Sequence, residues 1–148
     1  MFEASPWIAA AAWDTDRPFG SVEALHAAML RAVARAPERD RLALICAHPD
    51  LAGRAAIAGE LTPESTREQA AAGLDALTPE QHERIVTLTA AYRERFGFPF
   101  VVCAREHSPD SIVAAASSRL EADGAAEERT ALAEIAKIAR LRLDELVA

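Results

Sequence analysis

His48 lies where a helical pattern ends, directly before Pro49 and Asp50. Because proline disfavours the α conformation in the residue before it, the histidine ring is held at a turn of fixed local geometry. A helix C-terminus favours the protonated imidazole, so His48 is a candidate general acid or base. The alternative is structural: the ring would hydrogen-bond the last carbonyl groups of its helix. The local pattern alone favours that structural role.

The segment from Ser65 to Gln69 carries polar side chains at the start of a predicted helix. Ser65 and Glu68 have the spacing of a capping box, which is a structural role. Backbone N–H groups at a helix start also bind anions and carbonyl oxygens, so the same residues can form a polar wall for a ligand. The two roles are compatible, because Ser65 can cap the helix while Glu68 points elsewhere.

Arg142 interrupts the apolar face of the last predicted helix. At about 100° per residue it falls within that face, close to Ile135, whereas Arg140 and Lys137 fall at its edge or beyond. A buried guanidinium without a counter-charge is costly, so we expect Arg142 to pair with a carboxylate or to face an anionic ligand. A structural ion pair, or a side chain that reaches past the apolar face to solvent, explains the position equally well.

Residues 98–104 form a stretch that reads as extended rather than helical, and its sequence is Phe-Pro-Phe-Val-Val-Cys-Ala. A sheet needs a second strand, and we find no convincing partner. The backbone N–H and C=O groups of this stretch therefore need partners outside a sheet. A planar ligand rich in amide donors and acceptors would supply them. A partly solvated connection between helices is the alternative.

Capping residues, prolines and glycines divide the rest of the chain into helices. Ala, Leu, Glu and Arg are abundant and β-branched runs are short, which favours helix over strand. The start and stop signals predict helices at about 22–36, 37–47, 63–76, 79–96, 109–123 and 126–147. Among these signals, Ser21 caps the first of these helices, Thr78 and Gln81 have capping-box spacing, and Gly97 and Gly124 end the helices before them. Residues 50–61, with two glycines, read as a connection that includes at most a short helical turn. We expect an all-α, compact single-domain multi-helix bundle over residues 1–148, with one extended substrate-facing segment at 98–104.

Composition excludes several classes of function. A net charge of −7 argues against a nucleic-acid or membrane partner, and no apolar stretch is long enough to span a bilayer. The two cysteines, Cys46 and Cys103, have no disulfide or metal-ligand spacing, so we expect reduced thiols and a cytoplasmic location. No histidine or carboxylate pattern of a metal site is present, and we expect none.

Taken together, these segments resemble the family of OHCU decarboxylases, where OHCU is 2-oxo-4-hydroxy-4-carboxy-5-ureidoimidazoline. The resemblance extends over nearly the whole chain, and an isolated His-Pro-Asp tripeptide would be far less specific than these segments in order. The residues that carry it are Ser5–Trp7, Arg17–Phe19, His48–Gly53, Ser65–Gln69, Phe96–Ala104, Glu134-Ile135, Ile138 and Leu141–Leu143.

The resemblance implies the activity and the residues that carry it. Members of the family convert OHCU to (S)-allantoin in urate breakdown, are all-helical, need no cofactor and are mostly dimeric, so we expect a cofactor-free homodimer that acts on a small ureide. It implies His48 as the catalytic residue, and we add Glu68 as its partner, as a hypothesis. The substrate contacts that it implies are Pro49, Ser65, Thr66, Arg67, Glu68, Gln69, the backbone of Phe100, Val101, Val102, Cys103 and Ala104, and Arg142.

Two other functions remain open on the sequence. One is decarboxylation of a related ureide or hydantoin, because generic polar groups and backbone would bind such substrates equally well. The other is a non-enzymatic helical interaction domain, in which the apolar run at residues 96–102 forms a groove for a partner. Stabilisation of the fold by allantoin would separate an enzyme from an interaction domain.

Overall fold

The computed structural model describes residues 1–53 and 57–148. In these two ranges the chain forms helices and connections but no β-strand, so the all-α prediction is confirmed. The elements are α1 (Pro6–Asp16), α2 (Val22–Arg35), α3 (Glu38–Cys46), α5 (Pro63–Ala71), α6 (Pro79–Phe96), the 3₁₀ turn η1 (Ala104–Glu106), α7 (Pro109–Leu120) and α8 (Gly124–Val147).

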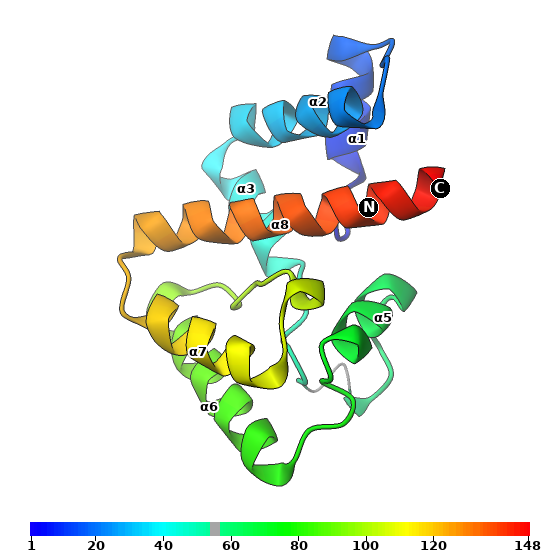
Figure 1. Ribbon diagram of the computed structural model, residues 1–148. Coiled ribbons are helices and arrows are strands. Elements are labelled where there is room, and N and C mark those ends of the chain that lie inside the picture. The colour runs from blue at the N-terminus through cyan, green and yellow to red at the C-terminus, as the bar shows by residue number, and fades with distance from the viewer. Residues whose placement is uncertain (54–56) are drawn as a thin grey trace.

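Helix α8 runs across the middle of the molecule (Figure 1). On one side, α1 and α2 pack against each other, and α2 and α3 contact α8; on the other side lie α5 and the paired helices α6 and α7. The N-terminus lies next to the C-terminal half of α8, so residues from opposite ends of the chain can meet there. The helix that carries Arg142 is therefore the element around which the other helices are arranged.

Several helix boundaries follow directly from capping chemistry. The side chain of Ser21 accepts a hydrogen bond from the N–H of Ala24 and begins α2. At the start of α6, Thr78 and Gln81 form the predicted capping box, and Gly97 ends that helix with a φ of +80°, a conformation that glycine adopts without steric cost. The structure confirms these three predictions.

Other boundaries differ from the predictions. Helix α1 was not predicted, although Ser5-Pro6 is a start signal, because its polar and apolar residues show almost no helical periodicity. Helix α5 ends at Ala71 rather than near Ala76, because the backbone of Gly73 turns to a positive φ of 78°. Gly124 does not end α7; it is the first residue of α8, capped by the side chain of Asp123.

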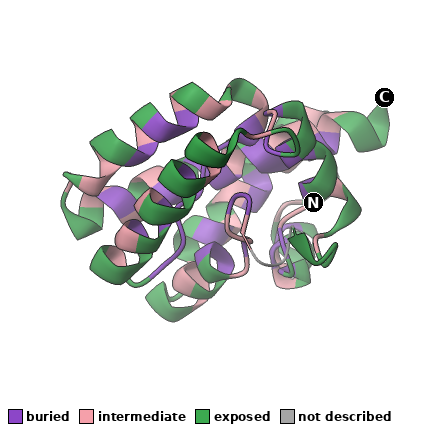
Figure 2. Ribbon diagram, turned by 90° about the horizontal axis from the view of Figure 1, so that it is seen from below, coloured by how far each residue is buried: buried purple, intermediate pink, exposed green. Residues whose placement is uncertain are grey.

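The extended segment runs from Phe98 to Cys103 and is buried along its whole length (Figure 2). Ala104, which was predicted as part of it, instead begins η1, because the carbonyl groups of Cys103 and Ala104 accept hydrogen bonds from the N–H groups of Glu106 and His107. Figure 1 shows the segment passing between α8 and the α6–α7 pair. Within residues 1–53 and 57–148 this run pairs with no strand, and because it is buried, a solvated connection is excluded.

The connection predicted for residues 50–61 is described only in part. Leu51 and Ala52 form a turn after Asp50, and both are buried. The short helical turn suggested for this connection falls partly on residues 54–56, which lie outside the described residues.

Candidate active site

A small cavity lies where the extended segment, α5 and α8 meet the turn after α3. Its volume is about 30 Å³, which admits a water molecule but is far smaller than the hundreds of cubic ångströms typical of ligand sites. The residues that line it are His48, Pro49, Leu51, Ser65, Glu68, Gln69, Phe100, Val101, Val102, Ala104, Ile138 and Arg142. All but Leu51 and Ile138 belong to the predicted site, so residues scattered over the chain converge on one point.

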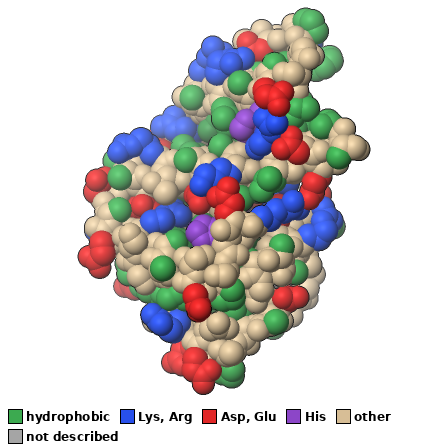
Figure 3. All heavy atoms as spheres, in the orientation of Figure 1, with side chains coloured by type: hydrophobic (Ala, Val, Ile, Leu, Met, Phe, Trp, Pro, Cys, Tyr) green, Lys and Arg blue, Asp and Glu red, His purple; other side chains and the backbone are tan. Residues whose placement is uncertain are grey.

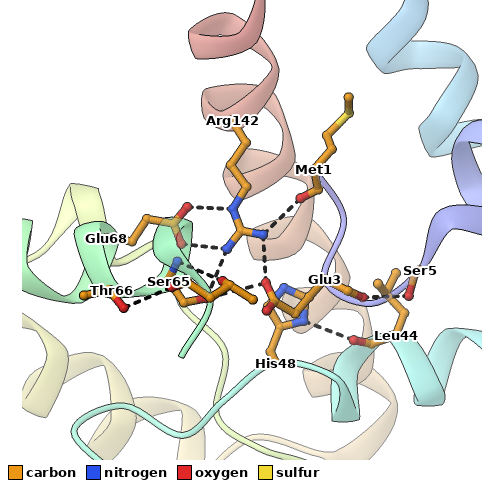
Figure 4. Close-up of polar contacts among 10 residues, drawn as sticks. Met1, Glu3, Ser5, Leu44, His48, Ser65, Thr66, Glu68 and Arg142 are labelled. Carbon is orange, nitrogen blue, oxygen red and sulfur yellow. Dashed lines mark hydrogen bonds and ion pairs between the residues drawn. The ribbon is translucent and has the colours of Figure 1, made fainter. Parts of the chain in front are cut away.

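The end of α3 fixes the orientation of the His48 ring. Nδ1 of His48 donates a hydrogen bond to the carbonyl oxygen of Leu44, 3.0 Å away (Figure 4). Because a carbonyl only accepts, Nδ1 carries the proton and Nε2 of the neutral ring has a free lone pair. No acceptor or donor in residues 1–53 and 57–148 contacts Nε2, and His48 lines the cavity. The structural bond and a role as a base are thus compatible.

The charge state of His48 differs from the prediction. Burial lowers the pKa of His48 below its ordinary value, and this effect outweighs the hydrogen bond to Leu44 and the negative charge of Glu3, which both raise it. The helix C-terminus favours the cation, as expected, but the ring is only 6% exposed and the loss of hydration dominates. The ring is therefore neutral at neutral pH.

Arg142 is buried, as the helical pattern predicts, and it lies between two carboxylates (Figure 4). Nε and Nη2 donate to the two carboxylate oxygens of Glu68 at 2.7 and 2.9 Å, and Nη1 donates to Glu3 at 2.8 Å. Burial disfavours the guanidinium charge, but the hydrogen bonds that Arg142 donates to Glu68 and Glu3 outweigh it and raise the pKa of Arg142 above its usual value.

All five N–H groups of Arg142 have protein partners. Nη1 also donates to the carbonyl oxygen of Met1 at 3.0 Å, and Nη2 also donates to the hydroxyl of Ser65 at 3.3 Å. A guanidinium has no further donors. Arg142 therefore forms a structural ion pair, which was one of the two alternatives. A ligand would accept a hydrogen bond from Arg142 only after one of these partners moved.

Glu3 is the residue that sequence reasoning missed. Its side chain is 8% exposed, and its carboxylate lies beside Arg142 and the Ser65 hydroxyl, which donates to it at 3.5 Å. Nothing in the local sequence around Glu3 marks it, because its partner is 139 positions away. The sequence likewise did not indicate that Arg142 would pair with two carboxylates, those of Glu3 and Glu68.

Ser65 does not cap α5, so the capping-box interpretation was wrong. The cap is Thr62, whose side chain accepts a hydrogen bond from the N–H of Ser65 itself. Three residues into the helix, Ser65 and Glu68 are both buried and face Arg142. Their polar atoms are therefore available to the site rather than used at the helix end.

Gln69 stabilises the turn at residues 50–52, which follows α3 and His48. Its side-chain oxygen accepts from the N–H of Ala52 at 3.0 Å, and its nitrogen donates to the carbonyl oxygen of Asp50 at 3.3 Å. Ala52 has a φ of +49°, which strains a residue that carries a Cβ atom. The amide of Gln69 thus stabilises a strained turn at the edge of the cavity.

Three predicted contacts lie outside the cavity. Thr66 is exposed, and its hydroxyl donates back to the carbonyl oxygen of Thr62. The side chain of Arg67 is 58% exposed and lies 3.8 Å from Glu145. Cys103 is buried in the core without lining the cavity, and burial raises the pKa of its thiol to about 11, so no thiolate is available there.

A larger hollow of about 410 Å³ lies on the other side of Gln69. Among its polar residues, Thr66 and Asp75 are exposed and His82 is half-buried, whereas the small cavity gathers buried groups with interacting charges. Functional groups are marked by such perturbed, convergent environments, so we assign the site to the small cavity.

Other classes of site find no support in the described residues. Within residues 1–53 and 57–148, no three His, Cys, Asp or Glu side chains gather as metal ligands would. No helix in this part of the chain is long and apolar enough to cross a membrane. Figure 3 shows Lys and Arg side chains interspersed with Asp and Glu on the face it displays, rather than gathered in one basic patch.

Comparison with known proteins places these features in a family. Residues 1–144 match the family model described as OHCU decarboxylase. A relative from Haloferax volcanii, named 2-oxo-4-hydroxy-4-carboxy-5-ureidoimidazoline decarboxylase, is 46% identical over 98% of this chain and 83% of its own length. One with the same name from Halalkalicoccus jeotgali is 42% identical over 99% of this chain and 80% of its own length.

A solved structure has the same fold. The crystal structure of an (S)-allantoin synthase superposes with a TM-score of 0.75 at 29% identity, over 97% of this chain and 46% of that one. The matched region is therefore less than half of that protein. The family model and the two relatives together cover every residue of the cavity, and the chain belongs to the OHCU decarboxylase family.

Proposed function

We propose that this protein decarboxylates OHCU to (S)-allantoin, without a cofactor, in urate breakdown. The observation that carries the proposal is the convergence of His48, Glu68, Arg142 and the extended segment on one cavity, in a chain of this family. The relatives bear the name of that activity, and the product gives the solved structure its name.

The substrate carries its own electron acceptor, and cofactors commonly serve that purpose in decarboxylation. Its carboxylate stands on a ring carbon that also bears a hydroxyl group and adjoins a C=N bond. As CO₂ leaves, the C–C electron pair forms a double bond to the neighbouring ring carbon, and the π pair of the C=N bond moves to nitrogen, which takes a proton. The hydroxyl then loses its proton to become a carbonyl, and the neighbouring carbon takes a proton on one face, which sets the (S) configuration.

His48 is the residue suited to accept the hydroxyl proton. His48 lines the cavity, its neutral ring has a free lone pair on Nε2, and Nδ1 is fixed on Leu44. Glu68 lines the same cavity and can accept a hydrogen bond from the same hydroxyl with its remaining lone pairs. General acid–base catalysis requires such positioned groups within hydrogen-bond reach of the proton that moves.

Arg142 acts in this proposal mainly by holding Glu68 in place. With Glu3 and Glu68 both bound to it, the cluster has one more negative than positive charge. Such a cluster does not grip the leaving carboxylate, which would stabilise the ground state and oppose loss of CO₂. A contact between Arg142 and a ring or ureido carbonyl stays a prediction, and it requires the Met1 or Glu3 contact to break.

The test follows the optical activity of the product. Urate oxidase and hydroxyisourate hydrolase generate OHCU in a cuvette, and circular dichroism records the appearance of (S)-allantoin when this protein is added. We expect the OHCU signal to decay much faster than in a sample without the protein. Decay at the protein-free rate contradicts the proposed function and leaves the fold assignment intact.

A second measurement addresses the interaction-domain alternative. Allantoin at concentrations well above its Kd should raise the melting temperature, because it binds the folded state alone. A ligand-independent melting temperature together with absent turnover would favour a protein-binding role for the apolar segment. Substrates related to OHCU, tested in the same cuvette, distinguish a different ureide decarboxylase.

Three further expectations belong to the proposal. By its resemblance to the family, the protein forms a homodimer, which light scattering coupled to size-exclusion chromatography measures. A single domain is expected to unfold in one cooperative transition. A cytoplasmic location remains a prediction from the reduced cysteines.

A further inference from the structure

A second buried polar network lies behind the extended segment. Arg119 on α7 donates from Nε to Oε1 of Glu127 at 2.7 Å, and the hydroxyl of Tyr92 donates to the same oxygen at 2.6 Å. Nη1 of Arg119 donates to the carbonyl oxygen of Val101 at 2.7 Å, and the guanidinium lies 4.5 Å from the centre of the Phe100 ring. None of Arg119, Glu127 and Tyr92 lines the cavity, whereas Phe100 and Val101 do.

This arrangement fixes which way the backbone of the segment faces. In extended backbone, the N–H and C=O groups of one residue point to one side and those of the next residue point to the other. Arg119 holds the carbonyl of Val101 on the side away from the cavity. By this alternation we infer that the N–H and C=O of Val102 point to the opposite side, toward the cavity that Val102 lines, and in the described residues no protein group bonds either of them.

A donor and an acceptor on one residue match the edge of an amide or a urea, which presents a C=O and an N–H side by side. The same pairing joins two residues across antiparallel strands. The ureide of the proposed substrate has this edge, so the lone extended run supplies half of a two-bond pairing. Rotation of the Val101–Val102 peptide would turn the Val101 C=O toward the cavity and the Val102 N–H away from it. The pairing would then be lost.

We propose that Arg119 is a positioning residue, which holds the Val101 carbonyl so that Val102 presents its N–H and C=O to an amide edge of the ligand. The inference rests on the proposed function. Lysine is a poor substitute, because it has a single nitrogen and cannot bond Glu127 and the Val101 carbonyl in the planar geometry of a guanidinium stacked on Phe100.

The test compares Arg119→Lys and Arg119→Met with the matched control Arg41→Lys. Arg41 forms an interhelical ion pair with Glu128, next to Glu127, and in the described residues it forms no hydrogen bond or ion pair with the extended segment. Three quantities are measured for each protein: kcat and KM for OHCU by circular dichroism, the Kd of allantoin from its effect on the melting temperature, and the melting temperature without ligand.

We expect Arg119→Lys to fold, with KM and the Kd of allantoin both raised about 10-fold, the effect of losing one or two hydrogen bonds to the ligand. We expect kcat to change little, because the contact is made in both the bound substrate and the transition state. Arg41→Lys should keep both constants. A folded Arg119→Lys with unchanged KM and unchanged Kd overturns the inference, even if its melting temperature falls.

Different results contradict the proposed function and the role of Arg119. Wild-type protein that neither turns over OHCU nor responds to allantoin contradicts the proposed function. Wild-type protein that does both, with an Arg119→Lys variant that behaves as the Arg41 control does, contradicts only the role of Arg119. Should Arg119→Met fail to fold, Arg119→Lys alone decides the question.

Discussion

Two arginines lie on opposite sides of the extended segment: Arg142, which is buried, and Arg119, whose side chain is 12% exposed. The difference between their networks separates chemistry from positioning. Arg142 lies between two carboxylates beside a neutral histidine, and its network lines the cavity. Arg119 pairs with one carboxylate, Glu127, away from the cavity. In the Arg119–Glu127 pair, the two charges cancel. In the Arg142 cluster, Glu3 and Glu68 outnumber the single guanidinium, so carboxylate lone pairs remain next to the His48 base.

The largest expected effect is on turnover, at the centre of the Arg142 cluster. His48→Ala should lower kcat by about 10²–10⁴-fold, the usual contribution of a positioned acid–base group. His26→Ala is the matched control, because that ring bonds the carbonyl oxygen of Ala136 on α8 and lies outside the cavity. Circular dichroism with OHCU measures both. Full turnover by His48→Ala would show that His48 and the Arg142 cluster beside it do not carry the chemical step.

Removal of either arginine tests the difference in charge balance. Arg142→Met leaves two buried carboxylates facing each other, and we expect a loss of about 3–5 kcal/mol in the free energy of unfolding. Arg119→Met leaves one, so its loss should be smaller. Urea denaturation measures both values. Equal losses would show that the excess carboxylate in the Arg142 cluster has no energetic consequence.

The pH dependence of activity should be set by His48. Its pKa lies below the ordinary value of 6.5, so the neutral base persists through neutrality and kcat/KM falls only at more acidic pH. Glu3 raises the pKa of His48, so Glu3→Gln should move this acid limb to lower pH. Stability shifts in the same window: below about pH 6.5 the unfolded chain takes up the proton first, and the fold loses stability as pH decreases.

The control for the pH prediction is a variant without the ring. In His48→Gln, the loss of stability between neutral pH and the acid limb should be smaller than in the wild type. An acid limb that stays in place in Glu3→Gln would mean that this carboxylate does not act on His48.

The smallest expected effect concerns Gly97, where the extended segment begins. Its φ of +80° strains any residue that carries a Cβ, although nothing lies within 4 Å of where that atom would be. Gly97→Ala should therefore cost about 1–2 kcal/mol of unfolding free energy, with KM and kcat close to those of the wild type. A raised KM would mean that the register of the segment depends on this turn as well as on Arg119.

Local chemistry accounts for the part of this protein that could be predicted. Ser21, the Thr78–Gln81 capping box and Gly97 mark helix ends through neighbours within a few positions, and the pattern around Arg142 marks its burial through one helix face. The extended run was also evident, because its residues interrupt a helical pattern. Such features depend on residues that lie close together in the sequence, so they can be predicted without knowledge of the fold.

The missed features depend on distant contacts. Glu3 meets Arg142 across 139 positions, and Arg119, which nothing in its local sequence marks, meets Val101 across 18 positions. The capping box assigned to Ser65 failed because Thr62 competes for the same helix start. The direction of the pKa shift of His48 depends on how deeply the folded chain buries the ring, which the adjacent residues do not determine.

The small volume of the cavity limits both how tightly and how fast the protein can bind its ligand. At about 30 Å³, the cavity is too small to enclose a ureide, so we expect the ligand to bind a more open state of the cavity. Observed affinity is then weakened by the fraction of molecules that are open, about 100-fold if that fraction is about 1%. A substitution that loosens the contact of Met1 or Glu3 with Arg142 would enlarge this fraction. Faster association would then accompany a less stable fold, so affinity and stability are traded against each other at the N-terminal segment.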